Sequence, residues 1–149
     1  MVNLSIYSLK LVKESGGRYD LPTKSIHSPK DVYKVVEEVF HLSEQAEEVL
    51  VMLTVDRQNN ISGCFKVSQG SVASSIVHPR EIFKRAVLAN ASSIILAHNH
   101  PAGSTTPSKE DKEVTKRIEE AGKIMGIELL DHIIVGDNNY SSFKEDGLL

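Results

Sequence analysis

Two histidines and an aspartate have the types and spacing of a metal-binding group. His98 and His100 are separated by one residue, and Asp111 follows eleven residues after His100. Two neutral imidazoles and one carboxylate are the ligand set of a catalytic zinc site, in which a fourth position stays open. The charge left on the ion lowers the pKa of a bound water to about 7. These residue types therefore predict a hydrolytic centre with one zinc ion per chain.

A strand is expected to place the two histidines side by side. Residues 94–97 are a continuous apolar run, which is typical of a strand buried on both faces. Side chains alternate along a strand, so His98 and His100 leave its end on one side while Asn99 points the other way.

The chain must then return to bring the carboxylate to the histidines. Residues 101–107 contain a glycine and are bounded by prolines, which predicts a reversal. Ser108 predicts the N-cap of the following helix, with Asp111 in its first turn. We expect this helix start to point Asp111 at the two imidazoles.

Helical and strand patterns alternate through the rest of the chain. They predict helices beginning at 28–29 and 79, an edge strand within 4–12, a loop or a narrow strand over 70–75, and strands over 49–55, 61–68, 128–135 and 140–143. The strands over 49–55 and 61–68 form a hairpin. The expected class is α/β, with a single mixed β-sheet flanked by helices. One domain is expected over 1–149, with 1–29 as a strand and loop extension and 30–149 as the core.

Composition restricts the function classes. The formal net charge of -3 over 149 residues does not favour a nucleic-acid surface, although it leaves such a partner open. No apolar run is long enough to span a bilayer, and no signal peptide is recognisable at the start. The single cysteine, Cys64, gives no disulfide framework and favours a reducing, cytoplasmic location. Oligomeric state cannot be read from these features.

A metal-activated water also needs a base that takes up its proton. Glu47 and Glu48 lie where the first helix gives way to the strand that starts at Val49. Either glutamate could lie at the rim of the sheet, near the end of the 94–97 strand, and spacing alone does not choose between them.

The spacing of His98, Asn99, His100, Ser108 and Asp111 resembles the His-x-His-x7-Ser-x2-Asp signature of the JAMM/MPN metalloproteases. Three longer stretches resemble the RadC branch of that family, namely HPREIFKRAV (78–87), IILAHNHPAG (94–103) and LLDHIIVG (129–136). The closing residues YSSF (140–143) and GLL (147–149) agree as well. The resemblance implies a cytidine-deaminase-like α/β fold and a metallopeptidase or isopeptidase acting on peptide-like substrates.

The resemblance also implies roles for individual residues. The implied zinc ligands are His98, His100 and Asp111, and Ser108 helps to stabilise the oxyanion. The base of the family maps onto Glu48, with Glu47 as the alternative. The RadC name implies an association with DNA repair, but nothing like the helix-hairpin-helix segment of longer members precedes residue 30.

Simpler interpretations of the same residues remain open. Ser108-x-x-Asp111 is also a helix capping signal, and Ser28-x-x-Asp31 has the same spelling with no histidine pair beside it. His132 is expected to be a hydrogen-bonded structural histidine. Two other functions stay possible, a nucleic-acid or protein-binding module that keeps zinc for structure, and a zinc-dependent nuclease.

Overall fold

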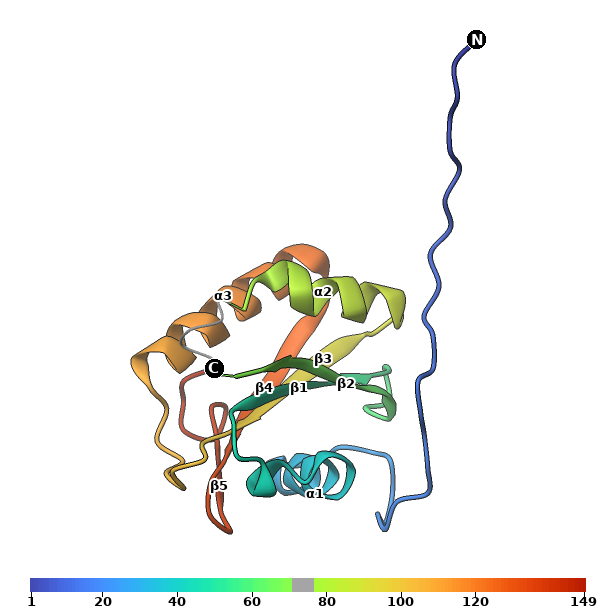
Figure 1. Cartoon of the computed structure of the whole chain (residues 1–149). Helices are drawn as coiled ribbons and strands as arrows, with labels where there is room; N and C mark the ends of the chain where they lie inside the picture. The colour runs from blue at the N-terminus through green and yellow to red at the C-terminus, as the bar shows by residue number, and fades with distance from the viewer. Residues whose placement is uncertain (71–76) are drawn as a thin grey trace.

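The computed structural model describes residues 1–70 and 77–149 (Figure 1). In chain order the elements are α1 (Pro29–Phe40), the 3-10 helix η1 (Leu42–Glu44), β1 (Val49–Val55), β2 (Ile61–Gln69), α2 (Pro79–Leu88), β3 (Ser93–Asn99), α3 (Lys109–Met125), β4 (Glu128–Val135) and β5 (Tyr140–Ser142). Each predicted element from α1 onward is present close to its expected bounds. The loop or narrow strand expected over 70–75 lies, apart from Gly70, outside the described residues.

The five strands form one sheet in the order β2-β1-β3-β4-β5. β3 and β4 are parallel, and the other neighbouring pairs are antiparallel. The predicted α/β class with a single mixed sheet is therefore confirmed. The β1–β2 hairpin is also confirmed, with its turn over 56–60.

Helices cover both faces of this sheet, with α1 on one side and α2 and α3 on the other (Figure 1). α1 packs on a core cluster that includes Val49, Val51, Ile95 and Ala97. The opposite cluster, beneath α2 and α3, takes the alternate residues of the same strands, such as Leu50 and Leu96. None of the described helices combines the length and apolar character that a bilayer span requires.

The central strands are buried on both faces, as the apolar run over 94–97 predicts. All seven residues of β1 are buried, and so are the last six of β3. Complete burial of one such aliphatic side chain contributes about 1.5–3 kcal/mol relative to exposure. β3 is thereby fixed between β1 and β4, and its last residues lie at the end of the central strand of the sheet.

The edge strand predicted within 4–12 is wrong. Residues 1–20 have no regular secondary structure and run away from the domain as an extended segment (Figure 1). Leu4 is 89% exposed and Ile6 is 99% exposed. The alternation of apolar and polar residues favours a strand, but this segment has no neighbouring strand with which to form hydrogen bonds. The chain first pairs with the sheet in an isolated bridge between Ser25 and Asn60.

Candidate metal centre

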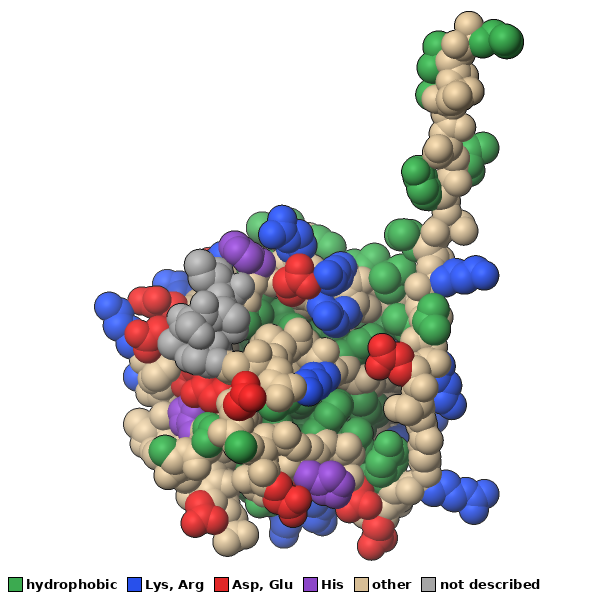
Figure 2. Space-filling model, in the orientation of Figure 1, with side chains coloured by type: hydrophobic (Ala, Val, Ile, Leu, Met, Phe, Trp, Pro, Cys, Tyr) green, Lys and Arg blue, Asp and Glu red, His purple; other side chains and the backbone are tan. Residues whose placement is uncertain are grey.

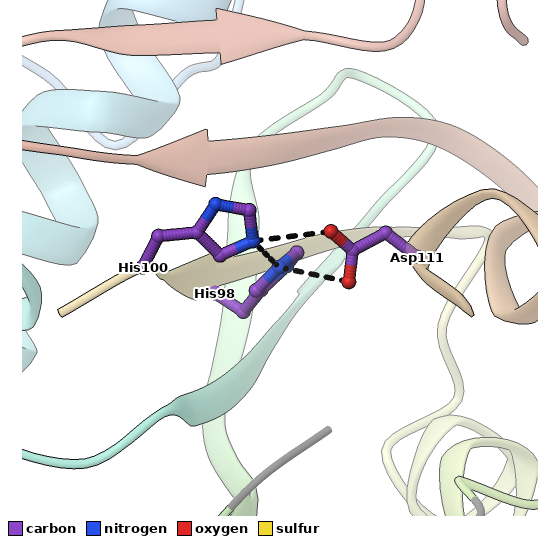
Figure 3. A group of neighbouring side chains, drawn as sticks. All are labelled: His98, His100 and Asp111. Carbon is purple, nitrogen blue, oxygen red and sulfur yellow. Dashed lines mark hydrogen bonds and ion pairs between the residues drawn. The ribbon is translucent and has the colours of Figure 1, made fainter. Parts of the chain in front are cut away.

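Two histidines and an aspartate converge at the end of β3 (Figure 3). His98 is the second-to-last residue of β3, and His100 directly follows the strand. Asp111 lies in the first turn of α3. The Nε2 atoms of the two imidazoles are 3.0 Å apart. The Asp111 carboxylate reaches both, with Oδ2 at 3.1 Å from His100 and Oδ1 at 3.3 Å from His98. The structure therefore brings together the three residues predicted as ligands.

The start of α3 holds the carboxylate in place. The Ser108 hydroxyl accepts a hydrogen bond from the backbone N–H of Asp111 at 3.0 Å, and the Asp111 carboxylate accepts one from the backbone N–H of Ser108 at 2.9 Å. Ser28 and Asp31 form a capping box of the same type at the start of α1. The alternative interpretation of Ser108-x-x-Asp111 is thus correct as well, because one carboxylate both caps the helix and faces the histidines.

The loop between the histidines and α3 is fixed by the β4–β5 turn. The backbone N–H of Asp137 donates to the carbonyl oxygen of Gly103. The Ser141 hydroxyl donates to the carbonyl oxygen of Thr105. A Cβ at Gly136 would lie 2.3 Å from the Gly103 oxygen, so only glycine permits this approach. These contacts bring the chain back from β3 to α3 with little freedom.

A backbone carbonyl sets the orientation of His100. Nδ1 of His100 lies 2.8 Å from the carbonyl oxygen of Ser104. A carbonyl oxygen can only accept, so Nδ1 carries the hydrogen and donates it. The other nitrogen, Nε2, then presents its lone pair to Asp111 and His98.

A chain of three hydrogen bonds sets the orientation of His98. The hydroxyl of Thr115 donates to the carbonyl oxygen of Asp111 at 2.7 Å, so its oxygen accepts from Nδ1 of His132 at 2.6 Å. Nε2 of His132 is left as the acceptor for Nδ1–H of His98 at 2.8 Å. Both imidazoles therefore direct unprotonated Nε2 atoms at the carboxylate, and His132 is a hydrogen-bonded structural histidine as expected.

The pKa values of the cluster follow from this arrangement. Burial by itself raises the pKa of Asp111, but the hydrogen bond that His100 donates once its Nε2 takes up a proton in the metal-free protein, together with the effect of His98, outweighs it and holds the pKa far below its ordinary value. The hydrogen bond to Asp111 raises the pKa of His100, against the opposing effect of burial. Burial lowers the pKa of His132 well below its usual range, which keeps this ring neutral.

The donor set fits a divalent metal ion. Two imidazole nitrogens and the two oxygens of one carboxylate lie 3.0–3.3 Å from one another across the site, and lone pairs at such distances repel unless a cation lies among them. In the metal-free protein, a proton on His100 can take the place of this cation, as the raised pKa of His100 indicates. The spacings are also near the edge of about 3.3 Å that a tetrahedron with zinc–ligand bonds of about 2.0 Å requires.

The sheet register separates the two candidate bases. Leu50 lies opposite His98 in the β1–β3 ladder, so a continued register places Glu48 opposite His100. The backbone N–H of Gly70 donates to the carbonyl oxygen of Glu48, which extends the β1–β2 ladder to this residue. The negative charge of Glu48 contributes to the raised pKa of His100. Glu47 lies in a bend ahead of β1, and its carbonyl oxygen accepts a hydrogen bond from Asn99.

Asn99 ties the Glu48 segment to the histidine strand. Its buried side chain accepts a hydrogen bond from the backbone N–H of Val49 at 2.7 Å and donates to the carbonyl oxygens of Glu47 at 2.9 Å and Gln45 at 3.2 Å. The residue that faces away between the two ligands thus fixes the backbone on both sides of Glu48. No sequence pattern predicts these roles of Asn99 and Thr115, or the bond from His132 to His98. An asparagine between the histidines was the only available signal.

Comparisons with known proteins show which family the chain resembles. The family model described as RadC-like JAB domain matches residues 26–148. A UPF0758 protein of Desulfitobacterium hafniense is 45% identical over 143 residues, which cover 95% of this chain and 62% of that protein. A UPF0758 protein of Caldanaerobacter subterraneus is 51% identical over 144 residues, covering 93% and 60%. One from Methanosarcina acetivorans is 46% identical, covering 86% and 55%. The chain thus spans somewhat more than half the length of these relatives.

Proposed function

Because the chain belongs to the RadC-like JAB domain family, we propose that it is a zinc-dependent hydrolase that cleaves amide or isopeptide bonds. The observation that carries the proposal is the convergence of the His98, His100 and Asp111 ligand atoms within 4.8 Å of one another. Two neutral imidazoles and one carboxylate leave a divalent ion with net positive charge and an open position, the arrangement of catalytic zinc sites.

Separate hydrogen bonds orient each of the three proposed ligands. His98 and His100 are held with their Nε2 lone pairs toward the site by His132 and the Ser104 carbonyl. Asp111 is held by the capping box of α3. When bound, zinc would supply Lewis-acid chemistry, lowering the pKa of a water to about 7 and polarising a carbonyl group.

Glu48 is the proposed base. It precedes β1 on the face that carries His98, and its charge acts on His100. We assign it the transfer of a proton from the attacking water to the departing amine, a role that contributes about a hundred- to ten-thousandfold in general acid–base catalysis. The Asn99 hydrogen bonds on either side keep its backbone at the rim of the site.

Ser108 is the proposed oxyanion donor. Its oxygen accepts the Asp111 N–H, which uses a lone pair and leaves the hydroxyl hydrogen able to donate. A hydroxyl that is already oriented by a helix cap loses little freedom when it binds the developing negative charge. A single donor of this kind contributes about 3–4 kcal/mol to the transition state.

Charge favours a carbonyl substrate over a phosphodiester. Glu48 acts on the site from one side, and the chain as a whole carries a formal net charge of -3. A neutral amide approaches such a site without repulsion, whereas an anionic phosphodiester or a DNA strand is repelled. The nuclease and nucleic-acid alternatives are therefore less favoured, although the RadC resemblance links the family to DNA repair.

The proposal can be tested with purified protein. Elemental analysis measures the metal content, and a panel of peptides, lysine-linked isopeptides and single-stranded DNA is incubated with and without a chelator. We expect about one zinc per chain and chelator-sensitive cleavage of an amide substrate. Glu48→Gln should retain zinc and lose cleavage, while the neighbouring Glu47→Gln should retain both. Zinc-free protein, or cleavage of DNA alone, would overturn the proposal.

A further inference from the structure

Most of the exposed large hydrophobic side chains of the described residues lie in residues 1–20. Of the thirteen such side chains in residues 1–70 and 77–149, nine lie between Met1 and Tyr19. Figure 2 shows these side chains on a segment that projects from the domain. An exposed apolar cluster of this kind on a protein surface marks a contact with another surface.

The apolar residues alternate as they do in a strand. Val2, Leu4 and Ile6 occupy one set of alternate positions, and Leu9 and Leu11 occupy the other, with Tyr7 at the change of phase. The segment is therefore a strand sequence that lacks a sheet.

The total surface is larger than a single folded domain requires. The chain exposes 9283 Å². A folded monomer of its 16.4 kDa mass is expected to expose about 7,500 Å². The excess of about 1,800 Å² exceeds the roughly 800 Å² that each partner buries in a standard interface. Docking of this segment therefore offers enough area for a stable complex.

β2 is the outermost strand on its side of the sheet, and over residues 61–67 exposed and partly buried positions alternate. Within the described residues its outer edge is paired only at its start, where the backbone N–H of Ile61 donates to the carbonyl oxygen of Lys24. Among the described residues, the bridge between Ser25 and Asn60 is the only ladder pairing recorded outside the named strands. The outer backbone groups of β2 can thus accept a further strand.

The segment cannot reach its own β2 by continuing that bridge. Ser25 and Asn60 pair antiparallel, so a continued ladder would place Gly16 opposite Gln69, the last residue of β2. Residues 2–12 would then lie beyond the end of the strand. Pro22, which has no backbone N–H to donate, lies within the part that would pair.

We propose that residues 2–12 add as a strand to the outer edge of β2 in a second copy of the chain, so that two chains exchange strands. The exchange is reciprocal, because each copy carries one segment and one edge, and it closes as a two-fold dimer. It buries the exposed apolar residues and pairs the free edge. Since β1 lies between β2 and β3, the exchange leaves the residues of the metal centre uncovered and does not depend on the proposed activity.

Molar mass in solution tests the dimer. Light scattering on the eluting full-length chain should give twice 16.4 kDa. Ile6→Asp should shift the chain to the monomer mass without loss of helical and strand circular dichroism. Ile124→Asp is the matched control, because Ile124 is 87% exposed on α3 and should leave the dimer intact. A monomeric parent chain, or a dimer that survives Ile6→Asp, would overturn the proposal.

Cross-linking tests the docking edge. Cys64 is the only cysteine of the chain and is exposed in the middle of β2. Single cysteines placed in turn at positions 4 to 9 should form disulfide-linked dimers with Cys64 at every second position, because strand side chains alternate. Cys64→Ser should abolish these products. Linkage within one chain, or linkage without the alternation, would refute docking on the β2 edge of a second copy.

Discussion

Two matched capping boxes allow the metal role of Asp111 to be separated from its structural role. Asp31 and Asp111 each close a capping box with a serine three residues earlier, at the starts of α1 and α3. Only Asp111 has two imidazoles within 3.3 Å of its carboxylate. Asp31→Ala and Asp111→Ala therefore remove the same type of helix cap, but only the second removes a proposed metal ligand.

The expected magnitudes differ enough to be measured. Loss of a capping box costs about 1 kcal/mol, which for a domain of this size lowers the melting temperature by about 3 °C. Zinc at about a thousand times its dissociation constant stabilises the folded state by about 4 kcal/mol, or about 12 °C. We expect Asp31→Ala to melt about 3 °C lower and to keep the full zinc-dependent increase, and Asp111→Ala to lose that increase.

Thermal melts with chelator and with added zinc give these values directly, and elemental analysis of the same samples gives the metal content. The parent chain and Asp31→Ala should bind equal amounts of zinc, which shows that a lost cap does not by itself empty the site. The reasoning is refuted if Asp111→Ala keeps the zinc-dependent increase, or if Asp31→Ala loses it to the same degree.

Three further results are expected. Asn99→Ala frees the backbone on both sides of Glu48, so metal content should stay unchanged while any hydrolysis falls by about a hundredfold, as measured by initial rates. His132→Phe breaks the hydrogen bond that orients His98, so zinc affinity should fall about ten- to a hundredfold in competition titrations with a chelating dye. The raised pKa of His100 contributes stability to the metal-free protein below its unfolded value of about 6.5, and this contribution is lost as the pH rises through the folded value. Zinc meets less competition from protons over the same interval, so the zinc-dependent increase in melting temperature should grow between about pH 5.5 and 8.

The sequence predicted most elements because their local signals agreed with the final packing. The apolar run over 94–97 is buried on both faces, and the Ser108 cap lies where the helix begins. The predicted strand within 4–12 was wrong because its local signal did not agree with the final packing. Its alternation gives a strand preference, but a strand forms only where another strand offers hydrogen-bond partners, and the chain alone does not supply them there.

The ligand types and their order along the chain came from the sequence alone, because His98, His100 and Asp111 belong to one strand–loop–helix unit whose geometry is local. The side of the sheet taken by Glu48 depends on antiparallel pairing between residues some fifty positions apart, which no local pattern encodes. The same is true of the bonds from Thr115 through His132 to His98, since they join α3, β4 and β3. Tertiary packing therefore set which lone pairs face the site and which face of the sheet Glu48 takes, because both follow from contacts between distant segments.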